Sequence, residues 1–163
     1  MSSPEAPKSF LEKAKDAAVN VAANAKAAAQ IAGKQAEHGK LTQMTLPSAY
    51  WALGKDIYGA GRFRDEFGEL FTKLGGLVSK IQSLKQAHPA SEQPQKLTDR
   101  AKAAAGHAVD LAKIKSVEME ANGVLRELGK QAYGKHVDGA GAANLTQPIV
   151  QAFARLETLD LEI

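Results

Sequence analysis

The sequence predicts an all-α protein made of two similar halves. Apolar residues recur every three or four positions along most of the 163 residues, which is the spacing of one face of a helix. No stretch shows the sustained apolar and polar alternation of a half-exposed strand. A short motif in the first half also returns 75 residues later. We therefore expect tandem duplicated αα-hairpins, each with a long alanine-rich helix and a shorter return helix, in a four-helix bundle-like or antiparallel coiled-coil arrangement.

The repeat is clearest in residues 53–59, LGKDIYG, which return as LGKQAYG at residues 128–134. Five of these seven residues are identical in the two copies. Such a repeat indicates that one supersecondary unit occurs twice and that both copies bury the same face. At the same spacing Leu74 aligns with Ile149, so we expect both side chains to be shielded from water.

Composition changes divide the chain into four parts. Residues 1–7, with two prolines and two serines, are expected to form a disordered lead. Residues 8–86 and 97–163 are expected to form the two helical hairpin repeats, joined by a proline-containing linker at residues 87–96. The apolar pattern continues to the last residues, which would fit a domain excised from a longer protein.

Each half begins with an alanine-rich helical segment, at residues 8–40 and at about residues 96–115. Alanine has the highest helix propensity but buries little apolar area. Such helices need a partner at close range, and their small side chains permit the close approach. We expect the two alanine faces to pack on each other or on a neighbouring chain.

Both long segments contain a helix-weakening feature at the same aligned position. The first has Pro47-Ser48, and the second has Asn122-Gly123. Proline inside a helix removes a backbone donor and costs about 3 kcal/mol, whereas glycine costs about 1 kcal/mol. The fold could use a kink or break here, or Pro47 could occupy the first turn of a new helix capped by Thr45. The sequence leaves these alternatives open.

The return helices carry regular apolar seams. Their residues follow the alternating spacing of four and three that is typical of left-handed helix packing, and neighbouring apolar residues widen them. The first seam consists of Phe63, Phe67, Leu70, Leu74, Leu77, Ile81 and Leu84, widened by Phe71 and Val78. The second consists of Leu145, Ile149, Ala152, Leu156, Leu159 and Ile163, widened by Val150 and Phe153.

The repeated motif has a functional and a structural interpretation. Its lysines and tyrosines could recognise an acidic or aromatic ligand. Alternatively, Gly54 and Gly129 would let the return helix approach closely, and the motif's last glycine would end each helix. Packing and capping account for every residue of the motif, so we favour the structural interpretation.

One aromatic residue near the first motif is not repeated, since Trp51 aligns with Arg126. It could fill the end of the core or anchor an interface. The candidate interaction surface therefore consists of Trp51, Lys55, Tyr58, Lys130 and Tyr133.

Reactive and ligand-binding patterns are missing from the sequence. It has no cysteine, which excludes disulfides and thiolate metal sites. It also lacks a phosphate-binding loop, a nucleophile elbow and the Glu-x-x-His pairs of di-metal bundles. We expect a protein that is not an enzyme, with no catalytic residue, no metal and no cofactor.

These features predict a non-enzymatic protein-protein interaction or scaffold module, with a protein partner or a second copy of itself in a homodimer. An alternative is an amphipathic-helix binder of lipid or granule surfaces, although such helices usually carry larger apolar residues. Nucleic-acid binding ranks third, because the net charge of +3 is small and mixed with acids. No transmembrane segment is expected, and the N-terminal residues lack a signal-peptide layout, so we expect a cytoplasmic protein.

Residues 46–58, LPSAYWALGKDIY, together with residues 62–67, RFRDEF, resemble a helical segment of uncharacterised bacterial multidomain proteins. This resemblance implies a helical module and carries no catalytic residues. The alanine- and lysine-rich opening is also similar in composition to amphipathic helices of desiccation and granule-coating proteins.

Overall fold

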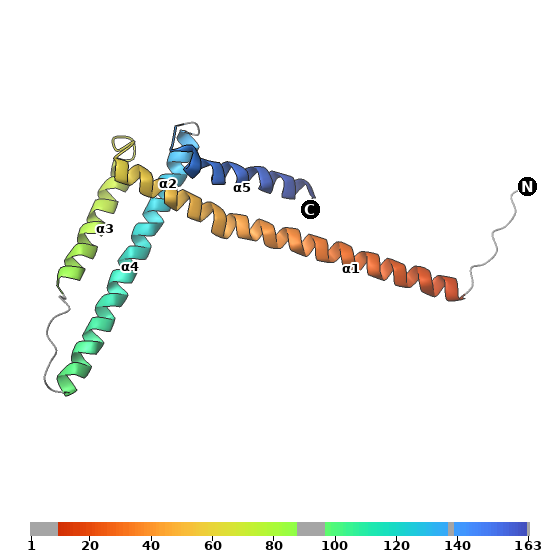
Figure 1. Ribbon diagram of the computed structural model, residues 1–163, viewed down its shortest axis with the longest axis horizontal. Coiled ribbons are helices and arrows are strands. Elements are labelled where there is room, and N and C mark those ends of the chain that lie inside the picture. Colours follow the sequence, from red (N-terminus) through yellow and green to blue (C-terminus); the bar gives the residue numbers. More distant parts are fainter. Residues whose placement is uncertain (1–9, 88–96, 137–138, 163) are drawn as a thin grey trace, which may run out of the picture.

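The computed structural model describes residues 10–87, 97–136 and 139–162, and within these residues every regular element is a helix. This confirms the predicted all-α class, and the helices pack together as Figure 1 shows. The elements, in chain order, are α1 (Phe10–Lys40), η1 (Leu41–Thr45), α2 (Leu46–Ala60), α3 (Gly68–Gln86), α4 (Leu97–Lys135) and α5 (Ala143–Glu162). The predicted lead and most of the predicted linker lie outside the described residues.

The first long helix continues past Pro47 without a break. Helix α1 runs into η1, a single π-helical turn, and η1 runs directly into α2. Pro47 lies in the first turn of α2, where its missing N–H is tolerated. Thr45 makes no capping hydrogen bond. The wider π turn therefore absorbs the proline within one continuous helical path.

The second long helix crosses the aligned position with no irregularity. Helix α4 extends over 39 residues through Asn122-Gly123. Glycine lowers helix propensity but keeps its backbone N–H, so it does not interrupt the hydrogen-bonding pattern. Each half therefore contains a long continuous helical path, but the first has a π turn next to this position and the second has none.

Helices α2 and α4 cross at the two motif glycines. A Cβ atom on Gly54 would overlap the carbonyl oxygen of Leu125, and a Cβ atom on Gly129 would overlap the carbonyl oxygen of Tyr50. These contacts are reciprocal, since Tyr50 and Leu125 are themselves 75 positions apart. The close approach predicted for the glycines exists, but it joins the two long helices and does not involve a return helix.

The return helices do not pack as in two self-contained hairpins, where each would lie mainly on the long helix of its own half. Helix α3 lies along α4, and α5 lies along α2, η1 and the end of α1. Ion pairs border the α3–α4 contact, with Lys73 Nζ 3.3 Å from Glu120 and Lys85 Nζ 3.2 Å from Glu118. Each return helix therefore covers mainly the long helix of the other half of the chain.

The core is centred on the α2–α4 crossing and on the faces that the return helices bring to it. Leu74 and Ile149 are 1% and 0% exposed, as expected from the seams. Leu53 and Leu128, which align at the repeat spacing, are both fully buried. Three residues expected to widen the seams stay substantially exposed: Val78, Val150 and Phe153.

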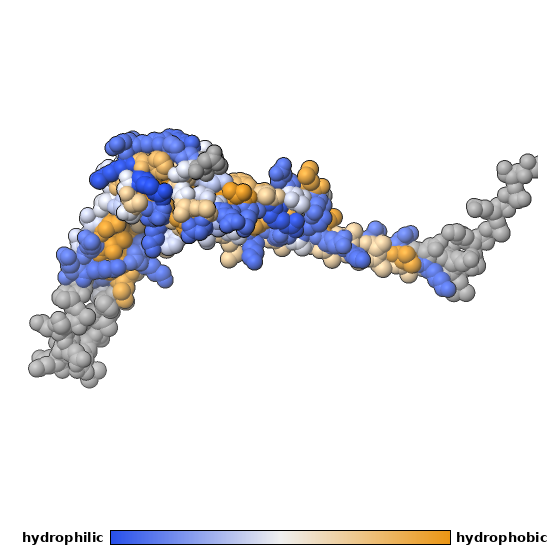
Figure 2. Space-filling view, turned by 45° about the horizontal axis from the view of Figure 1, so that its top comes forward, coloured by the Kyte–Doolittle hydropathy of each residue, from blue (hydrophilic) through white to orange (hydrophobic). Residues whose placement is uncertain are grey.

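The two alanine-rich segments do not pack on each other. In Figure 1 the N-terminal part of α1 and that of α4 project in different directions from the crossing. Every residue from Ala17 to Gly33 is exposed. Figure 2 shows this part of α1 as a narrow rod with pale-orange surface and a few blue side chains. We call residues 17–33 the α1 arm.

Candidate interaction surfaces

The five residues predicted as an interaction surface do not line a common pocket. Trp51 lines a hollow of about 380 Å³ between α2 and α4. Tyr58 lines a larger hollow beside α3, and Lys130 lines a groove of about 450 Å³ between α2, α4 and α5. These residues lie on α2 and α4, which cross, so they are distributed around the crossing.

Two contacts hold Trp51 in place, one at its indole N–H and one over its ring. Its Nε1–H donates a 2.8 Å hydrogen bond to Oδ1 of Asn122 on α4. The Lys55 ammonium lies 5.2 Å from the centroid of the indole ring, within the range of a cation–π interaction. Trp51 is partly buried and fastens α2 to α4 beside the glycine crossing.

Tyr58 packs at the corner between α2 and α3. Its ring centroid lies 5.2 Å from that of Phe71, with the planes tilted by 38°. Beside this pair is an open hollow of about 1010 Å³. Four glycines and one alanine contribute to its lining, together with Tyr58, Arg64, Asp65, Phe71 and Thr72. The small lining residues explain the size of the hollow.

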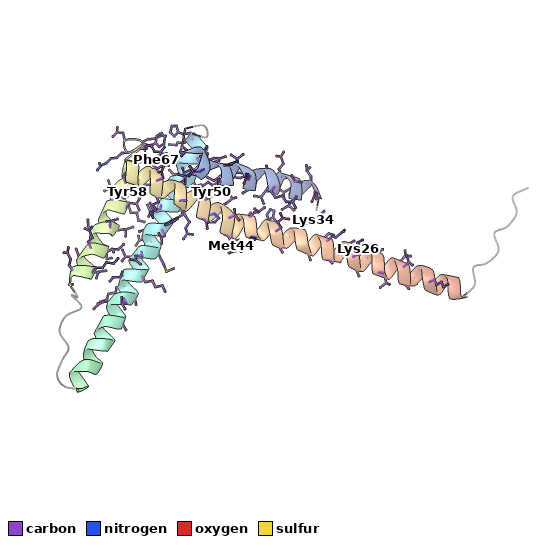
Figure 3. All side chains as sticks on the ribbon, viewed as in Figure 1. Lys26, Lys34, Met44, Tyr50, Tyr58 and Phe67 are labelled. Carbon is purple, nitrogen blue, oxygen red and sulfur yellow. The ribbon has the colours of Figure 1, made fainter. Side chains whose placement is uncertain are left out.

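The equivalent tyrosine of α4 joins an aromatic row that runs from α2 to α5. Tyr133 lies 6.2 Å from Tyr50 and 6.4 Å from Phe153, measured between ring centroids. Burial raises the pKa of the Tyr50 phenol, and the neighbouring Tyr133 adds to the effect. Tyr50, labelled in Figure 3, sits where α2 meets α4. This aromatic row borders the groove that Lys130 lines.

The loop between α2 and α3 is clamped to the C-terminal end of α4. Helix α2 ends at Ala60 and is capped by Gly61, whose φ of 65° is left-handed. Gly59 and Gly134 lie inside α2 and α4, so the prediction that the motif's last glycine ends each helix is wrong. Phe63 also has a positive φ, 56°, which is unusual for a residue with a side chain. Its ring stacks on that of His136 at 4.4 Å between centroids, and this contact holds the loop in place.

A carboxylate in the same loop strengthens the clamp. Glu66 Oε2 lies 2.6 Å from Nε2 of His136, and Glu66 Oε1 lies 3.2 Å from Nζ of Lys135. The hydrogen bond from His136, aided by Lys135, holds the pKa of Glu66 below its ordinary value, although desolvation acts in the opposite direction. The sequence contained no signal for this cluster, because its partners lie 70 residues apart.

The base of the α1 arm is tied to α5 by charged side chains. Glu37 accepts two hydrogen bonds from Arg155, at 2.7 and 2.8 Å. Lys34 Nζ lies 3.0 Å from the backbone oxygen of Glu162. The Arg155 hydrogen bond holds the pKa of Glu37 below its ordinary value. Figure 3 shows α1 continuing past Lys34, towards the N-terminus, beyond the end of α5.

Within the described residues, no three histidine, aspartate or glutamate side chains gather in a way that could hold a metal ion. None of the helices, as far as the structure describes them, is long and apolar enough to cross a membrane.

Comparisons with known proteins add no relative. No family model, curated protein or solved structure matches the chain. The resemblance of residues 46–58 and 62–67 to a segment of bacterial proteins therefore stays a prediction.

Proposed function

We propose that this protein is a non-enzymatic helical scaffold that associates with a second copy of itself through the α1 arm. The observation that carries this proposal is the unbroken exposure of the arm, from Ala17 to Gly33. Over these 17 residues Lys26 is the only charged side chain. A soluble helix normally places charged residues on its free side, so an exposed arm of this composition favours a covering partner.

The arm offers its small apolar residues on the side that α5 leaves free. Helix α5 contacts α1 through Lys34 and His38. At about 100° per residue, Ala32 and Ala25 lie roughly opposite Lys34 around the helix axis. Ala18, Val21, Ala28 and Ala29 fall on the same side and are exposed. Because this stripe faces away from α5, extending α5 along α1 would not cover it.

A second copy of the arm matches this surface in size and charge. Alanine side chains let two helix backbones approach closely, and the contact then extends over several turns to bury enough area. The stripe contains no charged residue that would repel another copy. Val19, Val21 and Ile31, which are 66%, 69% and 41% exposed, add apolar area to the arm.

We also propose that the scaffold arose by duplication of a helix pair. The repeated motif, the reciprocal glycine contacts and the equal burial of Leu53 and Leu128 support this reading. In such an arrangement each long helix extends past the return helix of the other half. The duplication thereby creates two projecting helices, of which α1 is the more apolar.

Sedimentation equilibrium of the full chain at several concentrations tests the association. We expect a concentration-dependent dimer for the natural sequence. The double variant Ala25→Glu with Ala32→Glu places two charges on the stripe and is expected to be monomeric at the same concentrations. The matched control is Ala23→Glu with Ala27→Glu, which places the same charges on the opposite side and is expected to keep the dimer.

Three results would contradict the proposal. One is a natural chain that stays monomeric at the highest concentration reached. Another is an equal loss of association in both double variants, with helix content by circular dichroism unchanged. The third is binding to anionic vesicles that displaces the dimer, since this would favour a lipid-surface role for the arm.

A further inference from the structure

The α1 arm shows the same order of residue types when it is read in either direction. Ala25 is the middle residue of the arm and also of helix α1, Phe10–Lys40. Residues at equal distances before and after Ala25 are of one kind at every step through the arm. The polar pairs are Asn20 with Gln30 and Asn24 with Lys26, the β-branched pair is Val19 with Ile31, and each remaining pair consists of alanine with alanine, glycine or valine.

This symmetry suits two arms that lie antiparallel to each other. When two helices are related by a two-fold axis beside Ala25, each residue lies at the level of its counterpart from the other copy. Polar levels then coincide with polar levels, and apolar levels with apolar levels, along the whole arm. A parallel pair in register sets each residue beside its own copy and places no such requirement on the sequence. The symmetry therefore favours the antiparallel pair.

The stripe on the free side of the arm contains one pair of unequal size, and it favours the same direction. Val21 is 69% exposed, and its counterpart Ala29 is exposed as well. In an antiparallel pair each valine lies at the level of an alanine, so large and small side chains alternate along the contact. In a parallel pair the two valines would lie at one level. They would then hold the helices apart where the rest of the stripe is alanine.

The position of the other helices leads to the same conclusion. We call α2–α5, which pack together, the body. Figure 1 shows the body at the C-terminal end of α1, while the arm extends away from it as a single helix. Antiparallel arms would place the two bodies at opposite ends of the pair. Parallel arms would bring both bodies to one end, although helices packed through alanine need axes only about 8 Å apart.

We propose that two copies pair through antiparallel α1 arms centred on Ala25 and form a two-ended spacer. This inference rests on the association in the proposed function and adds the direction of pairing and its consequence. At a rise of 1.5 Å per residue, the Lys40 residues of the two copies would lie about 45 Å apart along the helices. The dimer would hold two identical bodies at this separation, and so would join two identical partners without bringing them together.

Single cysteines in the full chain test the direction, because the natural sequence contains none. Ala18→Cys and Ala32→Cys lie at paired levels on the stripe. The two variants, mixed and then oxidised, should form a disulfide-linked dimer. Neither variant should do so alone, because its own copies would lie about 21 Å apart, which is beyond the reach of a disulfide.

The matched control is a mixture of Ala23→Cys and Ala27→Cys. These positions are also paired in level about Ala25, but they lie on the opposite side of α1 from the stripe. This mixture should stay unlinked under the same conditions. Circular dichroism of each variant should match that of the natural chain, which shows that the helices are kept.

A distance between spin labels gives a second measurement. Lys40 is exposed at the end of α1, and a label at Lys40→Cys should report about 45 Å between the two copies. In a parallel dimer the labelled residues would lie at one level, on helices whose axes are about 8–10 Å apart.

Sedimentation equilibrium separates the two proposals. If the chain is a dimer but one stripe variant links by itself, or the label distance is short, the antiparallel pairing is wrong and association through the arm stands. A dimer whose Ala18 and Ala32 variants do not link, or whose control mixture links as readily, also contradicts the antiparallel pairing through this stripe. A natural chain that stays monomeric overturns both proposals.

Discussion

The α2–α4 crossing and the α1 arm use small residues in opposite environments. At the crossing, Gly54 and Gly129 are buried and let two helix backbones touch. In the arm, alanines and Gly33 face solvent on all sides, and a Cβ atom on Gly33 would meet nothing within 4 Å. Small residues thus permit close helix contact but do not by themselves select a partner.

The difference comes from what surrounds the small residues. Leu53 and Leu128 lie next to the crossing glycines and are completely buried. Burying each leucine side chain stabilises the fold by about 1.5–3 kcal/mol, relative to leaving that side chain exposed. The arm has few residues of that size, so its intrinsic helix propensity has to carry a larger share of its stability. The same substitution is therefore expected to act differently in the two regions.

The largest contrast is expected from truncating a large apolar side chain in each region. Leu128→Ala should lower the free energy of unfolding by about 2–5 kcal/mol, because it removes buried contacts and leaves a cavity. Val21→Ala in the arm should change it by less than about 0.5 kcal/mol. Urea denaturation at a protein concentration that keeps the chain monomeric measures both. Comparable losses would show that the arm is packed against the core.

The next contrast concerns the glycines of the crossing. Gly129→Ala should destabilise the fold by about 1–3 kcal/mol or more, since its Cβ would collide with the Tyr50 carbonyl, a backbone group that cannot rotate away. Gly54→Ala should do the same against Leu125. Urea denaturation followed by circular dichroism measures the loss. Neutral substitutions at both positions would contradict the close crossing.

A smaller effect of opposite sign is expected from the same substitution in the arm. Gly33→Ala should raise helix content and the melting temperature of the arm, because alanine is favoured over glycine in a helix by about 0.8–1 kcal/mol. No neighbouring atom opposes the added methyl group. Circular dichroism at 222 nm compared with the natural chain checks this. A loss of helicity would mean that Gly33 meets a partner in solution.

The smallest effect is expected at the junction between the arm and α5. Hydrogen bonds from Arg155 lower the pKa of Glu37 below its ordinary value of 4.5, so the ionised pair stabilises the fold above that pH. This contribution is lost as the pH falls through the lowered pKa of the folded state. Glu37→Gln should therefore reduce the difference in urea midpoint between pH 6 and pH 3.

The control for this pH experiment is Glu157→Gln on α5, because Glu157 makes no ion pair with a residue that the structure describes. Its pH dependence should match that of the natural chain. The Glu66 cluster is present in all three proteins and cancels in the comparison. An unchanged pH dependence in Glu37→Gln would show that the Arg155 contact does not persist in solution.

The all-helical class and the residues that face the core could be predicted from the sequence, because both depend on local spacing. The seam residues Leu74 and Ile149 are buried as expected. Helix partners could not be predicted, because an apolar seam fits several other seams equally well. The close approach of Gly54 and Gly129 was expected, but their mutual contact was not.

The candidate surface was harder to predict than the core. Trp51, Lys55, Tyr58, Lys130 and Tyr133 were grouped because of their sequence positions, and the crossing distributes them among separate hollows. The groove beside Lys130 involves residues from η1, α2, α4 and α5. One signal was available beforehand, since Trp51 is not repeated and Arg126 stands at the aligned position.

The sequence by itself determined the all-helical class, the faces that avoid water and the repeated motif, because spacing and propensity act within a few turns of one helix. The tertiary structure alone decided that α3 and α5 cover the long helix of the opposite half, that the motif glycines meet each other, and that the α1 arm is left without an internal partner. These outcomes depend on competition between distant apolar surfaces, and that competition is settled only when the whole chain packs.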